Sequence, residues 1–285
     1  TVLSLGATDE IDLTATLIDI NGNADVSGTV TATGTSVFAS LDISGDIDVD
    51  GTANLDAVDV DVSLTVDGTV KLNGNFPTGT DNVALGNDAL SDGSLSGAGN
   101  IAIGDSAAKA LTSGSNAIAI GRDAMSAAVF TGSDAVGVGR STLAALTSGS
   151  NNVAVGGLAG TALTTGGNNV ALGFEALKTE DTSGSATAIG YQALRVQNSG
   201  GSNSHNSAVG AGAGTSITTG NQNTIFGSAA ADALTDADFN VAMGYAALSS
   251  DTLGSRTVAI GTSALQTQNF TTATNSHNVG VGYFA

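Results

Sequence analysis

The chain has 285 residues, of which 40 are Gly, one is Pro and none is Cys, and its formal net charge is −19. Hydrophobic residues make up 41% and charged residues 12%, which excludes simple disorder, because disordered chains combine low hydrophobicity with high charge. Gly does not recur at every third position, which excludes collagen, and the lack of Cys excludes disulfides and thiolate sites. The acidic balance makes nucleic acid a poor partner, and no apolar run reaches the roughly 18 residues of a membrane span.

Residues 1–75 alternate apolar and polar side chains and hold 13 of the 26 acidic residues. The run from Val58 to Asp67 alternates strictly, which is typical of a half-buried strand. We expect residues 1–75 to form an acidic, β-strand-rich stem wound with its counterparts from other chains. Residues 76–80, which include Pro77, are expected to form a junction. The Asp-rich stem could hold Ca²⁺, although it contains no EF-hand or nonapeptide calcium motif.

From residue 81 onward, a block of the form apolar–Ala–apolar–Gly recurs twelve times, mostly 17 or 18 residues apart. Its closing glycines are Gly86, Gly104, Gly121, Gly139, Gly156, Gly173, Gly190, Gly210, Gly227, Gly244, Gly261 and Gly282. Ala stands three residues after the glycine in eleven copies, and Asn stands four residues before it in eight. A fixed period of this kind indicates stacked repeats. We therefore expect residues 81–285 to form an all-β solenoid (a β-roll) of about twelve coils.

Each coil has a predicted internal order. The apolar–Ala–apolar run forms a short strand and ends at a Gly that can take a positive φ and turn the corner. The segment around the following Ala-Leu is expected to form a second short strand, and a run of Ser, Thr, Gly and Asn closes the coil. The recurrent Asn has two interpretations: a ladder in which each amide bonds the next, or ordinary turn preference.

The middle residue of the block is nearly always Ala, although a one-sided surface strand would be polar there. One interpretation is that both strand faces are buried. The Ala face would then pack against the backbone of another chain, which predicts a homotrimer. The competing interpretation is that Ala fills a tight interior corner of the coil.

Two steps between blocks are longer, 20 and 21 residues, and both contain the sequence Asn-Ser-His-Asn. The related runs 193–198 and 264–269 precede them. We expect the extra residues to bulge outward and face a receptor, whereas the alternative is a duplicated loop without function. The residues concerned are Asn203, Ser204, His205, Asn206, Asn275, Ser276, His277 and Asn278. A metal bound by His205 is a weaker alternative, in which a trimer would supply three such side chains at one level.

No enzyme or cofactor site is predicted. His205 and His277 are the two histidines, and neither lies in a local Ser-His-Asp context. The pair Asp48 and Asp50 is better explained as a solvated strand face than as an acid/base couple. The glycines of residues 210–214 lack the Lys-Ser/Thr that completes a phosphate loop.

The block Asn240–Leu248 resembles the repeats of bacteriophage tail-fibre proteins. It is also similar to the head repeats of trimeric autotransporter adhesins, which form a left-handed β-roll in each chain of a trimer. The resemblance covers residues 81–285, and the stem segment 41–51 resembles the strand-rich shafts of phage fibres rather than a heptad stalk. The twelfth block is followed only by residues 283–285, and the chain opens at Thr1, so we expect a longer native polypeptide.

The resemblance implies a homotrimeric segment of a phage tail fibre, located in the virion, that extends and presents host-attachment elements. Its implied partners are its own copies, other virion tail proteins, and a glycan or protein of the host surface. The first alternative is the passenger or head region of a bacterial surface adhesin. The second is a tailspike that degrades glycans, which would need a carboxylate cluster in a cleft.

Overall fold

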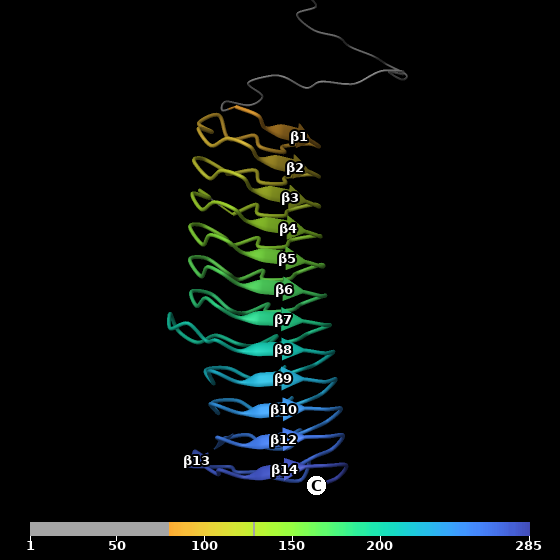
Figure 1. Cartoon of the computed structure of the whole chain (residues 1–285). Helices are drawn as coiled ribbons and strands as arrows, with labels where there is room; N and C mark the ends of the chain where they lie inside the picture. Colours follow the sequence, from red (N-terminus) through yellow and green to blue (C-terminus); the bar gives the residue numbers. More distant parts are fainter. Residues whose placement is uncertain (1–79, 128) are drawn as a thin grey trace, which may run out of the picture. The chain divides into compact units, whose positions relative to one another are not determined.

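The computed structural model describes residues 80–127 and 129–285. The stem expected over residues 1–75 and most of the 76–80 junction lie outside this part of the chain. In the described part the chain is all-β, and its consecutive coils stack into a β-solenoid of about twelve turns (Figure 1). The solenoid predicted from the repeat is therefore confirmed. No helix in residues 80–127 and 129–285 is long and apolar enough to cross a membrane.

Each coil contributes one strand to a parallel sheet of twelve strands that follow one another in chain order. The strands are β1 (Val83–Leu85), β2 (Ile101–Ile103), β3 (Ile118–Ile120), β4 (Val136–Val138), β5 (Val153–Val155), β6 (Val170–Leu172), β7 (Thr187–Ile189), β8 (Ser207–Val209), β9 (Thr224–Phe226), β10 (Val241–Met243), β12 (Val258–Ile260) and β14 (Val279–Val281). A second, two-stranded sheet pairs β11 (Gly254–Ser255) with β13 (Thr274–Asn275). We number the coils 1 to 12 in the order of the twelve-stranded sheet.

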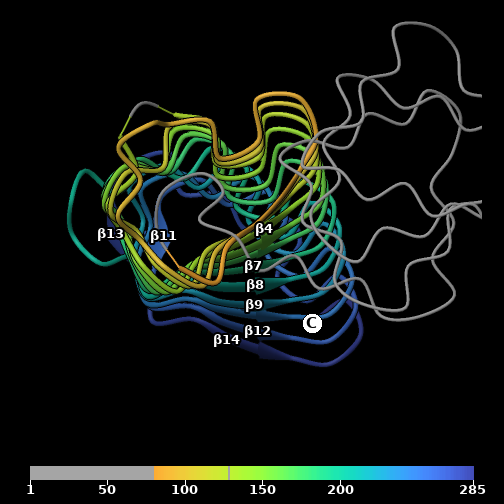
Figure 2. The ribbon, with the colours of Figure 1, turned by 90° about the horizontal axis from the view of Figure 1, so that it is seen from above.

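Neighbouring strands pair in the register of the repeat. In coils 6 and 7, for example, Ala171 lies opposite Ala188 and Leu172 opposite Ile189. The same positions therefore form straight columns along the solenoid, one residue per coil. Figure 2, which looks along the stack, shows the coils superimposed with the strands along one side.

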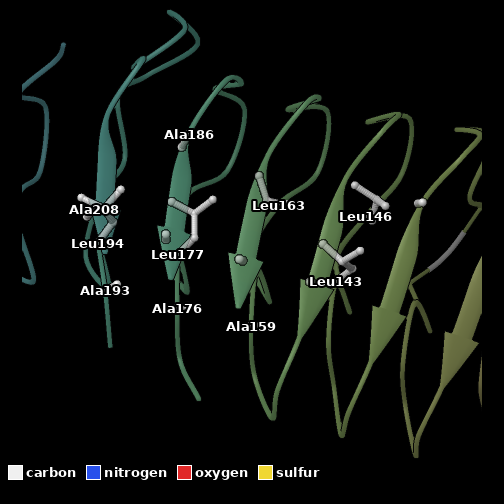
Figure 3. Packing of buried hydrophobic residues seen from close by; sticks show 14 of the residues in the cluster. Leu143, Leu146, Ala159, Leu163, Ala176, Leu177, Ala186, Ala193, Leu194 and Ala208 are labelled. Atoms are coloured by element: carbon white, nitrogen blue, oxygen red, sulfur yellow. The ribbon is translucent and has the colours of Figure 1, made fainter. Parts of the chain in front are cut away.

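The core lies inside the coils. The middle Ala of the strand points inward and is buried, as Ala171 and Ala188 show. Leu side chains from the rest of each coil, including Leu143, Leu163 and Leu177, fill the remaining interior (Figure 3). The interpretation in which Ala fills a tight interior corner is thus correct, and the one that placed another chain against the Ala face is wrong.

The second strand expected around Ala-Leu is not formed. In coil 6 the backbone after the strand alternates in the sign of φ, which is +136° at Gly173, +56° at Glu175 and +51° at Leu177. A strand would send Ala176 and Leu177 to opposite faces, yet both are fully buried. The alternating φ turns two successive side chains inward, and hydrogen bonds between coils hold this shape, such as Leu177 N–H to the Ala193 carbonyl at 3.0 Å.

The closing glycines are required by the stacking of the coils. Gly156 has a φ of +122°, and a Cβ added there would lie 2.7 Å from the carbonyl carbon of Gly173 in the next coil. Side chains other than Gly rarely adopt this φ, and no carbon atom fits at that distance. The periodic Gly of the sequence therefore reports a close approach of backbone to backbone.

The recurrent Asn forms a ladder, but its bonds run mainly from side chain to backbone. Asn169 is buried; its Oδ1 accepts from the Ala186 N–H at 2.9 Å, and its Nδ2 donates to the Ser183 carbonyl at 3.1 Å. Equivalent pairs of bonds are made by Asn82, Asn100, Asn152, Asn206, Asn223 and Asn240. One amide–amide bond accompanies them, from Asn223 to Asn206 at 3.2 Å. Each Asn thus satisfies buried backbone groups of the neighbouring turn.

Candidate interaction surfaces

The outer sheet face, which we define as the first and third residues of the twelve strands, is mostly apolar, and its side chains are half-buried or exposed. Successive strand residues point to opposite faces, so the inward Ala leaves its two neighbours outside. The third position is apolar in every coil and includes Leu85, 49% exposed, and Phe226, 57% exposed. Because the strands are in register, these side chains form a continuous column along the stack. Contiguous exposed apolar surface of this kind marks an interaction site.

The first strand position divides the outer sheet face into three zones. It is apolar in coils 1–6 and again in coils 10–12, from Val83 to Val170 and from Val241 to Val279. Between them it carries the hydroxyl residues Thr187, Ser207 and Thr224. The apolar surface is therefore narrower at coils 7–9 than at either end.

The first long coil has a protruding loop at residues 198–203, visible outside the outline of the stack in Figure 2. Asn203 and His205 are exposed, and their contact with a receptor stays a prediction. Ser204 and Asn206 are fully buried, so the prediction that these two face a receptor is wrong. Asn206 belongs to the Asn ladder, and its Nδ2 also donates to Gln197 Oε1 at 2.8 Å.

A buried carboxylate anchors this loop. Glu180 is fully buried one coil earlier, and it accepts hydrogen bonds from Gln197 Nε2 at 2.9 Å and from the N–H groups of Ser183 and Ser199 at 3.1 and 3.4 Å. Gln197 Nε2 also donates to Ser204 Oγ at 3.1 Å. Burial of a charge is costly unless hydrogen bonds compensate for it. Gln197 and Ser199 donate to Glu180 from the start of the loop, and Gln197 links this anchor to Ser204 at the end of the loop. The bonds therefore fix where the loop leaves and re-enters the coil.

The second long coil uses the same construction. The fully buried Asp251 accepts from the N–H groups of Gly254 and Phe270 at 3.1 and 2.9 Å and from Gln268 Nε2. Gln268 Oε1 in turn accepts from Asn278 Nδ2 at 2.7 Å. Of the predicted residues in this coil, Asn275, His277 and Asn278 are exposed and Ser276 is half-buried.

The roles of Glu180 and Asp251 were not predicted from the sequence, although their spacing from a later Gln indicates them. In both anchors the Gln follows the acid by 17 residues, which is one coil. The two related runs noted above end in Gln197-Asn198 and Gln268-Asn269. An acid one period before each Gln would have been found by aligning the coils in register.

The structure does not bring the two histidines together. His205 and His277 occupy the same position of their coils, just before Asn206 and Asn278, and both have a positive φ, +50° and +53°. Among residues 80–127 and 129–285, no three His, Asp or Glu side chains gather in a group that could hold a metal ion.

A charged and aromatic cluster lies at the corner after β6 and β7. The Glu175 carboxylate accepts from Lys178 Nζ at 2.6 Å, Gln192 Nε2 at 2.8 Å and Arg195 Nε at 2.9 Å. The hydrogen bond from Lys178, followed by that from Gln192, lowers the pKa of Glu175 to about 2. Beside it, the rings of Phe174 and Tyr191 stack with their centroids 5.9 Å apart and their planes 13° from parallel.

Comparison of this chain with protein-family models, with curated proteins and with solved structures found no match.

Proposed function

We propose that this chain is a structural segment of a homotrimeric fibre, most consistent with a phage tail fibre that extends and presents host-attachment elements. The observation that carries the proposal is the outer sheet face, which runs the length of the solenoid and which the rest of the described chain leaves uncovered. A second copy of the same chain can match this face coil by coil, because both have the same period.

The two columns of the outer sheet face can both be buried between three copies, and the choice of three rests on the resemblance to trimeric fibres. In a trimer each chain contacts two neighbours around one axis. The first-position column of one chain can then pack on the third-position column of the next, and every apolar column acquires a partner. Interfaces of obligate oligomers are apolar in this way.

The mechanical role follows from the stacking. With a rise of about 4.8 Å per coil, twelve coils span on the order of 55 Å. Every strand except the first and last of the twelve pairs on both sides, and the Asn ladder satisfies buried backbone groups between coils. Such a rod supplies length and stiffness, with no need for a catalytic site. Glu180 and Asp251, the two fully buried acids of residues 80–127 and 129–285, are occupied as hydrogen-bond acceptors.

The oligomeric state tests this proposal. The unmodified protein should sediment at three times the 27.5 kDa of one chain. Phe226→Glu places a charge on the outer sheet face and should yield folded monomers, because an unpaired charge is costly to bury. Ser228→Glu is the matched control, since Ser228 is exposed beyond the corner of the same coil and should leave the trimer intact. A folded monomer of the unmodified protein at micromolar concentration would reject the proposal.

The alternative is the head region of a bacterial surface adhesin, located at the cell surface. The two anchored loops favour it, because they project polar side chains from a rigid stack. Electron microscopy of the parent particle with an antibody against residues 80–285 separates the two proposals. Label along fibres of a virion supports the tail fibre, and label on the bacterial surface supports the adhesin.

A further inference from the structure

All three tyrosines of the chain occupy the same position of their coils, directly after the closing glycine. Tyr191, Tyr245 and Tyr283 are 55%, 61% and 76% exposed. Phe174 holds this position in coil 6, and the other coils have smaller or charged residues there. An aromatic ring at this corner gains little burial from the solenoid itself.

Tyr191 has one covered face and one open face. Phe174, one coil earlier, stacks on the first face. The two residues lie in consecutive coils, so their nearly parallel rings follow one another along the solenoid axis. On the other side, the next two coils carry Ala211 and Ser228 at this position. These small side chains leave an open step on the surface beside the Tyr191 ring.

Polar groups border this open step. Glu175 holds Gln192 Nε2 and Arg195 Nε by hydrogen bonds, and its lowered pKa keeps the carboxylate charged at neutral pH. This leaves the two Nη groups of Arg195 and the Oε1 atom of Gln192 without a hydrogen-bond partner among the described residues. The step therefore offers fixed donors and an acceptor next to a flat apolar ring.

We propose that Tyr191, Gln192 and Arg195 form a binding site for a neutral pyranose saccharide. The apolar C–H face of a pyranose packs on an aromatic ring at carbon–carbon distances of about 3.5–4.0 Å. Its hydroxyl groups both donate and accept, which matches the free Nη groups and Oε1. Arg195 and Lys178 already pair with the Glu175 carboxylate, which weakens their attraction for an anionic ligand. The site goes beyond the fibre proposal and does not depend on it, because it lies past the glycine corner and not on the outer sheet face.

Tyrosine emission gives a direct test in a chain without Trp. In the double variant Tyr245→Phe, Tyr283→Phe, Tyr191 is the one remaining tyrosine. This protein is titrated with neutral tetrasaccharides of glucose, galactose, mannose and N-acetylglucosamine at up to millimolar concentrations. At least one should change the emission with saturation, and the same titration in 0.5 M NaCl should give the same curve. If the change in tyrosine emission disappears in 0.5 M NaCl, binding is ionic, and the neutral-saccharide proposal is overturned.

Single variants of the full chain then assign the site by calorimetry with the tetrasaccharide that binds. Tyr191→Ala should weaken binding at least tenfold and Arg195→Ala at least threefold. Tyr245→Ala, at the same position of a coil without the Gln and Arg neighbours, should leave affinity unchanged. Ala211→Tyr should abolish binding, because the new ring would cover the open face of Tyr191. This variant removes none of the side chains that bind the sugar. The proposal is overturned if none of the four sugars binds, or if Tyr191→Ala and Ala211→Tyr bind as the unmodified chain does.

Discussion

The Oδ1 atom of Asn152 accepts a hydrogen bond of 3.0 Å from the backbone N–H of Asn169, its counterpart one coil later. Asn152 Nδ2 donates at the same time to the Gly166 carbonyl at 2.8 Å. One side chain thus satisfies two backbone groups of the neighbouring turn, where no strand pairing is available. The ladder therefore joins the turns of successive coils, as the twelve-stranded sheet joins their strands.

Removal of one rung should destabilise the stack. Asn169→Ala leaves the Ala186 N–H and the Ser183 carbonyl buried without their partner, and such a loss costs about 1–3 kcal/mol per group. We expect a clear decrease in the melting temperature followed by circular dichroism. Asn87→Ala is the control, because Asn87 is exposed, and it should melt within a degree or two of the unmodified protein. Equal melting of both variants would contradict a structural role for the ladder.

A methyl group at a closing glycine should be far more damaging than one at an open glycine. Gly156→Ala brings a Cβ to 2.7 Å from the carbonyl carbon of Gly173 and imposes a φ of +122° on Ala. We expect a loss of more than about 3 kcal/mol, the range of severe core changes. Gly93→Ala meets no atom within 4 Å and should be neutral. Denaturant unfolding of the two variants checks the contrast, and similar midpoints would refute it.

The Glu175 cluster should make stability depend on acid pH. The folded-state pKa of about 2 lies below the ordinary value of 4.5, so the unfolded chain binds the proton more readily. The stabilising contribution of the carboxylate is therefore present above about pH 4.5 and is lost as the pH falls towards 2. Glu175→Gln should flatten the dependence of melting temperature on pH in this window. High salt should reduce the difference between the two proteins, because the ion pairs with Lys178 and Arg195 are partly exposed.

The fold could be predicted from the sequence because the repeat encodes it directly. The Gly period marks the closest backbone contacts, such as Gly156 against Gly173, and the middle Ala marks the inward strand position. The conformation after the glycine could not be predicted in this way. Ala176 and Leu177 look like part of a strand, but alternating φ signs turn both side chains inward, and the hydrogen bonds that stabilise this backbone come from neighbouring coils.

The candidate surfaces were predicted less well, for a related reason. Whether a residue of a long coil is buried depends on a partner one period away, as with Gln197 and Glu180. Sequence spacing showed that the coils are longer but not which of their residues return to the core. Likewise, the apolar first and third residues of each strand were predicted to be buried. Within one chain, the inward middle residue is the buried one.

The buried anchor should control the loop at residues 198–203 without controlling the fold. Glu180→Ala leaves the N–H groups of Ser183 and Ser199 without this acceptor and removes one of the two acceptors of Gln197 Nε2. Buried donors without a partner are costly. We expect the loop to open more often and a protease to cut within it at least five times faster, while the β-sheet circular dichroism signal stays. Ser202→Ala, which changes only an exposed side chain of the loop, should be cut at the original rate. If Glu180→Ala is cut no faster than Ser202→Ala, the loop is held by its own backbone, and the carboxylate has no anchoring role.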